Sequence, residues 1–104
     1  ILKGYKSAPS MELAGGNSES IRAWLEYQWT EGMTWETQGM YGWHIDHRKP
    51  CDAFDLMDPV EQRACCNWRN LQPMWATENL EKHAKWTEAD EVQWQEEVGQ
   101  YIEN

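Results

Sequence analysis

Long apolar runs are absent from this chain of 104 residues. A membrane-spanning helix needs on the order of 18 consecutive apolar residues, and no segment comes near that length. The start of the chain also lacks the charged and apolar regions of a signal peptide. We therefore expect a protein that does not cross a membrane. Because the first residue is Ile1 rather than methionine, we expect a processed protein or a piece of a longer one.

Cysteine is scarce, with only Cys51, Cys65 and Cys66 in the chain. An odd count that includes an adjacent pair excludes both a disulfide framework and a zinc ribbon built from two Cys-x-x-Cys pairs. We expect the three thiols to be free and mostly buried in the core of an intracellular protein, in the reducing cytoplasm or nucleus. No structural zinc is expected.

Basic residues are also few: nine stand against 18 acidic ones, which gives a formal net charge of −9. Such a chain is not expected to bind nucleic acid strongly and without specificity. The acidity is uneven, however. Residues 86–104 carry six acids and no cation, whereas residues 44–85 carry six cations and seven acids. A local basic cleft in the middle segment therefore remains compatible with the acidic whole.

The pattern of apolar residues, caps and breakers predicts one small, mostly helical α+β domain, 1–104, with an amphipathic helix at its C-terminal end. Eight tryptophans provide large apolar surfaces for its core. The expected elements are helix 20–29, loop 33–42, strand 43–47, helix 59–67, extended segment 70–75, helix 76–85 and helix 88–102.

Local signals fix the ends and faces of these helices. Asn17 or Ser18 is expected to cap the first helix, Asp58 with Pro59 to start the second, and "TEAD" (87–90) to form a capping box. The apolar face of the first helix should consist of Ile21, Trp24, Leu25 and Gln28. The inward residues expected for helices 59–67 and 88–102 are Val60, Ala64 and Cys65, and Trp94, Val98, Tyr101 and Ile102.

Polar residues suited to phosphodiester hydrolysis gather around the short strand. Asp46 and His47 end it, Asn70 follows a helical excursion, and Asn79 shares a helix face with Lys82 at i+3. Hydrolysis needs a base that is neutral near pH 7, which histidine provides, and a divalent cation to stabilise the leaving oxygen. Magnesium accepts carboxylate and amide oxygens and retains several waters.

The segments "WHIDH" (43–47) and "NLQPMWATENLEK" (70–82), together with the upstream "LEYQWTEGMTWETQG" (25–39), resemble the HNH endonucleases, in particular the compact phage- and virus-type members. The resemblance covers roughly residues 11–85 and leaves the acidic helical tail 86–104 outside. It implies a ββα-metal core, in which two short strands and a helix hold one divalent ion. It also implies hydrolysis of DNA, by nicking or double-strand cleavage, with 5′-phosphate and 3′-hydroxyl products.

The resemblance also implies roles for individual residues. His47 takes the place of the general base, and Asp46 and Asn79 those of the ligands to Mg²⁺, with Mn²⁺ as the other candidate ion. Asn70 takes the place of a mainly structural asparagine that holds the strand of the base. His44 lies two residues before Asp46 on the same strand face, where it would touch the metal, a water molecule on the metal, or a phosphate.

Three cations, Arg48, Lys49 and Lys82, are candidates for binding the phosphates of DNA. The chain departs from the family pattern at two of them, because Arg48 and Lys49 stand where relatives more often have aliphatic residues. "AGG" (14–16) also stands where a Leu-Gly-Cys turn is frequent. None of these changes removes a catalytic position.

Two other functions remain open. The HNH fold could serve as a nucleic-acid or protein interaction module without strong catalysis, or the net charge of −9 could make the chain a DNA mimic. Clustering of the acids in one tail speaks against a mimic. Taken alone, His47 would be an ordinary polar histidine and Asn79 a helix N-cap or surface residue, but the full pattern favours the catalytic and metal-ligand roles. Since the chain is acidic, we expect a further domain or a partner protein to supply sequence specificity for DNA.

Overall fold

The computed structural model describes residues 15–82 and 85–102, so the irregular start expected for residues 1–10 lies outside the described residues. The predicted α+β class is confirmed, and the elements follow the predicted order. They are α3 (Ser18–Gln28), β1 (Trp43–His47), η1 (Cys51–Ala53), α4 (Pro59–Cys66), η2 (Trp68–Asn70), β2 (Leu71–Trp75), α5 (Ala76–Lys82), α6 (Glu88–Glu97) and η3 (Gly99–Tyr101).

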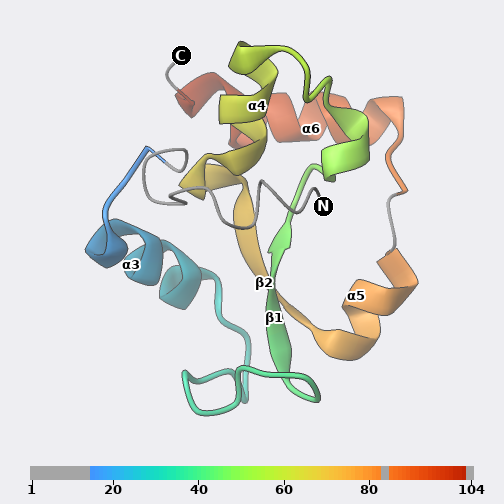
Figure 1. The fold of residues 1–104 in the computed structure, drawn as a ribbon. Helices are drawn as coiled ribbons and strands as arrows, with labels where there is room; N and C mark the ends of the chain where they lie inside the picture. Colours follow the sequence, from blue (N-terminus) through green and yellow to red (C-terminus); the bar gives the residue numbers. More distant parts are fainter. Residues whose placement is uncertain (1–14, 83–84, 103–104) are drawn as a thin grey trace.

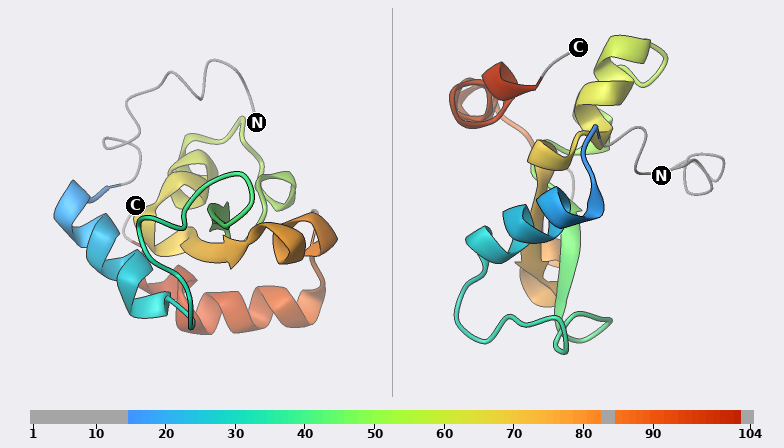
Figure 2. Two further views of the ribbon diagram at one scale, coloured as in Figure 1. Left: turned by 90° about the horizontal axis from the view of Figure 1, so that it is seen from below. Right: turned by 90° about the vertical axis from the view of Figure 1, so that its left-hand side faces the viewer.

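The two strands pair antiparallel at the centre of the fold. The register places Trp43 opposite Trp75 at one end and His47 opposite Leu71 at the other. Helix α3 lies on one side of the strand pair and α5 on the other, while α4 and α6 gather at the end where β1 finishes and β2 begins (Figure 1). The side view in Figure 2 shows the same arrangement, with α3 in front of the strands. Helices thus pack against the strand pair on both of its sides.

Helix α3 matches the sequence prediction closely. The side chain of Asn17 accepts a hydrogen bond from the backbone N–H of Ser20 at 2.8 Å, which is the predicted cap. Leu25 is buried in the expected apolar face, and the Trp24 indole donates to the carbonyl of Leu71 at 2.9 Å. This bond fixes α3 against the first residue of β2.

Helix α4 begins as predicted, with Asp58 accepting from the N–H of Val60 at 2.9 Å and Pro59 in the first turn. The inward position predicted for Val60 is wrong, because this side chain is 44% exposed. Burial on α4 is confined to its last turn, at Cys65 and Cys66. The first turn therefore projects beyond the core, and periodicity alone could not reveal this.

Helix α6 has the predicted capping box, in which Thr87 and Asp90 satisfy each other's backbone N–H groups. It ends at Glu97 rather than near residue 102, and the chain continues in the tighter helix η3. The change of helical period turns Tyr101 outward, to 55% exposure, so its predicted burial is wrong. Trp94, Val98 and Ile102 are buried as expected.

The tail packs on the domain as expected rather than standing apart. Trp94, Val98 and Ile102 join Phe54 and Cys65 in one core cluster. A second packed region surrounds Trp43, whose ring lies against those of Trp29 and Trp35 at centroid distances of 6.0 and 5.4 Å. These two packed regions lie at opposite ends of β1, which begins at Trp43.

Helix α5 spans Ala76–Lys82, and residues 83–84 of the predicted helix 76–85 lie outside the described residues. Lys85 follows in an irregular segment. Across residues 15–82 and 85–102, no helix combines the length and apolar character needed to cross a membrane.

Candidate active site

One face of β1 carries oxygen and nitrogen donors toward α5. The amide Nδ2 of Asn79 lies 3.4 Å from Nδ1 of His44, and the ammonium of Lys82 lies 3.0 Å from Oδ2 of Asp46. His44 and Asp46 share this strand face because they are two residues apart. We call His44, Asp46 and Asn79 the oxygen face, because two of the three offer an oxygen ligand. Residues separated by more than thirty positions in the chain meet here.

The carboxylate of Asp46 is held from two directions. Gln72, which lies opposite Asp46 in the register, donates from Nε2 to Oδ2 at 2.9 Å, on the same oxygen that Lys82 contacts. The side chains of Asp46 and Lys82 are only 13% and 18% exposed. Lys82 also donates to the carbonyl of His47 at 2.8 Å, so one ammonium binds two consecutive residues of β1.

His47 points away from this face. Its ring nitrogen, Sγ of Cys51 and Sγ of Cys65 all lie within 4.8 Å of one another, and we call these three residues the thiol cluster. Burial is the main cause that lowers the pKa of His47 below its ordinary value of 6.5; Asp46 opposes this and Lys82 reinforces it. The imidazole is therefore mostly neutral at pH 7, as a general base requires.

The two thiols of the cluster are not equivalent. Cys65 donates through its Sγ to Sγ of Cys51 at 3.3 Å. This hydrogen bond lowers the pKa of Cys51 to about 7, while the same bond and burial raise the pKa of Cys65. The expected burial of Cys65 and Cys66 is confirmed, with exposures of 0% and 7%. Sequence reasoning missed the cluster, because only the fold brings positions 47, 51 and 65 together.

Asn70 is fully buried and uses its whole amide group for internal hydrogen bonds. Its Oδ1 accepts from the N–H of Lys49 at 2.9 Å and from the Trp94 indole at 2.8 Å. Its Nδ2 donates to the carbonyls of Lys49 at 3.1 Å and Cys65 at 3.0 Å, and its own carbonyl accepts from the N–H of Arg48 at 2.7 Å. Asn70 thus ties the loop after β1 to α4 and α6, so any effect on substrate acts through the residues that it positions.

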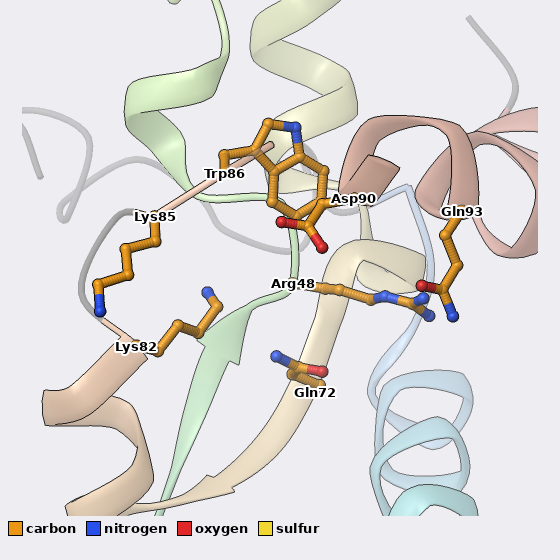
Figure 3. A pocket seen from close by; sticks show the side chains of 7 residues that line it. All are labelled: Arg48, Gln72, Lys82, Lys85, Trp86, Asp90 and Gln93. Carbon is orange, nitrogen blue, oxygen red and sulfur yellow. The ribbon is translucent and has the colours of Figure 1, made fainter. Parts of the chain in front are cut away.

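A pocket with a volume of about 300 Å³ is lined in part by Gln72 and Lys82, the two residues that contact Asp46. Lys82 and Lys85 lie on one side of it and Gln93 on the other, and the guanidinium of Arg48, between them, is directed toward Gln93 (Figure 3). Gln72 lies below Arg48 in this view and Trp86 above it. Among the described residues that line it, Asp90 is the one acid beside three cations, so this lining carries an excess of positive charge. The lining consists of Arg48, Gln72, Lys82, Lys85, Trp86, Asp90 and Gln93, and we call it the cationic pocket.

Two of the three predicted phosphate-binding cations, Arg48 and Lys82, line this pocket, and Arg48 also pairs with Glu97 of α6. Lys49 lies elsewhere. Its ammonium is 2.9 Å from Glu91, lies over the rings of Phe54 and Trp94 at 4.4 and 5.0 Å, and is largely buried. The structure therefore gives Lys49 a place in the core rather than in the pocket.

Gln72 and Lys85 line the pocket although sequence reasoning did not select them. The position of Gln72 follows from the strand register, because Trp43 opposite Trp75 places Asp46 opposite Gln72. An explicit pairing of the two extended segments could therefore have found it. No comparable sequence signal marks Lys85, which lies in the irregular segment that precedes α6.

Comparison with known proteins identifies relatives but no activity. The chain is 43% identical over 83 residues to "Uncharacterized protein L426" of Acanthamoeba polyphaga mimivirus, which covers 80% of the chain and 36% of that protein. It is 35% identical over 80 residues to "Uncharacterized protein L246" of the same virus, covering 77% of the chain and 35% of that protein. The chain thus spans about a third of the length of the curated relatives it matches.

No protein-family model matches the chain, and no solved structure matches it.

Proposed function

We propose that this chain is a metal-dependent endonuclease domain of the HNH type that hydrolyses phosphodiester bonds in DNA. One observation carries the proposal: α5 lies across β1 so that Asn79 contacts His44 and Lys82 contacts Asp46. An antiparallel strand pair followed at once by a helix supports the proposal, because the HNH resemblance implies a ββα arrangement. The Asp46–His47 pair stands at the end of its first strand.

The donor atoms of the oxygen face suit a hard divalent cation. Asp46 offers carboxylate oxygens, Asn79 an amide oxygen and His44 a ring nitrogen, a set compatible with Mg²⁺ or Mn²⁺. The ammonium of Lys82 at 3.0 Å from Asp46 indicates that a cation is stable beside this carboxylate. When bound, the metal ion would neutralise charge on the phosphate and stabilise the leaving 3′ oxygen.

His47 is the proposed general base. Burial favours its neutral form, so the imidazole can take a proton from the water that attacks phosphorus. Asn70 positions it, because the hydrogen bonds of this asparagine fix the two residues that follow His47. Since neighbouring strand residues point to opposite faces, the scissile phosphate must lie beyond the end of β1, where Asp46 and His47 can both be reached.

The cationic pocket is the proposed binding site for a phosphate group adjacent to the scissile phosphate. Arg48, Lys82 and Lys85 can donate charge-assisted hydrogen bonds to phosphate oxygens. Contacts of this kind orient the DNA backbone without reading its sequence. Sequence specificity is therefore assigned to a further domain or a partner protein, in keeping with the net charge of −9.

A supercoiled-plasmid assay tests the proposal. With Mg²⁺ or Mn²⁺ the chain should convert supercoiled DNA to open-circular or linear DNA, and EDTA should stop the reaction. His47→Ala should lower the rate by about 10²–10⁴-fold, the usual contribution of a general base. Added imidazole should restore part of the rate of this variant, because it replaces the lost base.

Undiminished cleavage by His47→Ala would refute the role of the base. A folded, metal-binding chain that cleaves with neither ion would support the alternative of an HNH-fold interaction module. A DNA mimic is less well supported, because Glu91 and Glu97 of the acidic tail already pair with Lys49 and Arg48.

A further inference from the structure

We propose that the thiol cluster, His47, Cys51 and Cys65, binds a soft divalent metal ion such as Zn²⁺, and that this ion blocks the proposed general base. The three donor atoms lie within 4.8 Å of one another, and the two sulfurs are 3.3 Å apart. No disulfide joins the sulfurs, since Cys51 and Cys65 are both free thiols. This site differs in residues and in donor chemistry from the oxygen face.

The distances are close to those that a zinc site needs. Zinc binds sulfur at about 2.3 Å and histidine nitrogen at about 2.0–2.1 Å, so tetrahedral geometry puts ligand atoms roughly 3.5–3.8 Å apart. The separation of Cys51 and Cys65 is slightly shorter than this range, and no pair of donors exceeds 4.8 Å. Small side-chain rotations would therefore complete the geometry. With three protein ligands, the fourth position would be left to a water molecule or an anion.

The backbone that carries the three ligands is firmly held. His47 ends β1, Cys51 starts η1, and Cys65 lies in the last turn of α4. Asn70 connects these segments, because it donates to the carbonyl of Cys65 at 3.0 Å and forms two hydrogen bonds with the backbone of Lys49. The cluster is thus organised before any ion arrives, which lowers the cost of ordering its ligands on binding.

Ligand softness separates the two sites on β1. Thiolates favour zinc and related ions, whereas carboxylate and amide oxygens favour magnesium. A soft ion should therefore select Cys51 and Cys65 even in an excess of Mg²⁺. The claim that the bound ion blocks the general base rests on the proposed function. A metal ion on His47 uses the lone pair that must accept the proton. Bound zinc and base catalysis by His47 therefore exclude each other.

Titration of the full 104-residue chain with Co²⁺ under a non-thiol reductant tests the binding itself. Thiolate ligation should produce a near-ultraviolet charge-transfer band, and Zn²⁺ should displace the cobalt and abolish the band. Cys51→Ser should weaken zinc binding by more than about 100-fold, since loss of a ligand should exceed the 10–100-fold effect of losing an outer-shell partner. Cys51 is the better position to change because it is only partly buried.

Cys66→Ser is the matched control, because it changes a neighbouring buried thiol that interacts with Cys65 but is not one of the three candidate ligands. The charge-transfer band should persist in this variant. Absence of the band in the unchanged chain, or its persistence in Cys51→Ser, would overturn the site. Loss of the band in a folded Cys66→Ser variant, judged by circular dichroism, would overturn this choice of ligands.

Inhibition is measured separately, as the fall in Mg²⁺-dependent plasmid cleavage when Zn²⁺ is added. Each variant is compared with its own rate without zinc, and Cys51→Ser should require a much higher zinc concentration for half-inhibition. Equal zinc sensitivity in both proteins would overturn the link to the base. The cobalt spectrum needs no nuclease activity, so failure of the proposed function and failure of the metal site give different results.

Discussion

The two sides of strand β1 differ in the metal chemistry that they offer. Toward α5, His44, Asp46 and Asn79 present mainly hard donors next to the ammonium of Lys82. On the other side, His47 joins Cys51 and Cys65, a nitrogen with two sulfurs. The adjacent residues Asp46 and His47 contribute to opposite sides, because side chains alternate along a strand. Adjacent residues in a motif therefore need not share surroundings.

Asn70 ties the loop after β1 to α4 and α6, so its loss should have the largest effect on stability. Asn70→Ala would leave buried partners without hydrogen bonds at Lys49, Cys65 and Trp94. At about 1–3 kcal/mol for each unsatisfied buried group, partly relieved by relaxation, we expect a loss of roughly 3–5 kcal/mol. Urea unfolding measures this. A matched control is Asn67→Ala, which removes a buried asparagine whose side chain, within residues 15–82 and 85–102, accepts one hydrogen bond, from the N–H of Arg69.

If Asn70→Ala and Asn67→Ala lost similar stability, the several hydrogen bonds of the Asn70 side chain would stabilise the fold no more than the single bond of Asn67 does. A selective effect would also appear in the cobalt spectrum, because the positions of Cys51 and Cys65 depend on the residues that Asn70 binds.

Removing the carboxylate of Asp46 should separate the two environments. Asp46→Ala should abolish stabilisation by Mg²⁺, which for the unchanged chain amounts to about 2.7 kcal/mol at a free concentration 100 times Kd. It should leave the cobalt charge-transfer band in place, because none of the ligands of the thiol cluster is altered. Thermal unfolding with and without Mg²⁺ measures the first effect. Asp52→Ala, an exposed carboxylate on η1, is the control.

Persistence of the Mg²⁺ shift in Asp46→Ala would mean that the ion binds elsewhere. Loss of both the Mg²⁺ shift and the cobalt band in folded Asp46→Ala would mean that the residues of β1 contribute to one metal site, not two.

Features of the fold that depend on local signals could be predicted from the sequence. Strand 43–47 and the caps at Asn17, Asp58 and Thr87 were predicted correctly, because alternation and capping are local signals. The meeting of Asn79 and Lys82 with β1 was expected from their shared helix face and the HNH resemblance.

What could not be predicted depends on tertiary packing. The thiol cluster forms only when α4 returns Cys65 to the end of β1. The burial of Lys49 depends on Glu91 of α6, in the segment beyond the family resemblance. Val60 and Tyr101 were misplaced because helical periodicity says which residues share a face, not where a helix leaves the core or changes its period.

Acid should weaken the attachment of α6 to the loop after β1. Burial alone raises the pKa of Glu91, but hydrogen bonds from Lys49, Gln95 and Trp86 outweigh it, so the net pKa lies below 4.5. A depressed carboxyl pKa adds stability that is present above the unfolded-state value near 4.5 and is lost as the pH falls through the lower folded-state value. Glu91→Gln should therefore flatten the decline of stability below about pH 4.5 and cost about 1 kcal/mol at pH 7.

Urea unfolding at a series of pH values measures this difference, with the exposed Glu88→Gln as control. Identical pH profiles for Glu91→Gln and the unchanged chain would show that the Lys49–Glu91 pair does not contribute to acid sensitivity.

The smallest expected effect concerns the balance of charge in the cationic pocket. Arg48 pairs with Glu97, lowering the pKa of that exposed carboxyl, so a phosphate must compete with Glu97 for the guanidinium. Glu97→Gln should release Arg48 and tighten binding of short duplex DNA about two- to five-fold, the size expected of one exposed ion pair. Glu96→Gln makes the same charge change at an exposed neighbour, so any excess effect of Glu97→Gln must come from Arg48. If both variants bound DNA more tightly by the same factor, the change in net charge alone would explain the effect. If Glu97→Gln tightened DNA binding alone but not in combination with Arg48→Gln, Glu97 would be shown to weaken phosphate binding by pairing with Arg48.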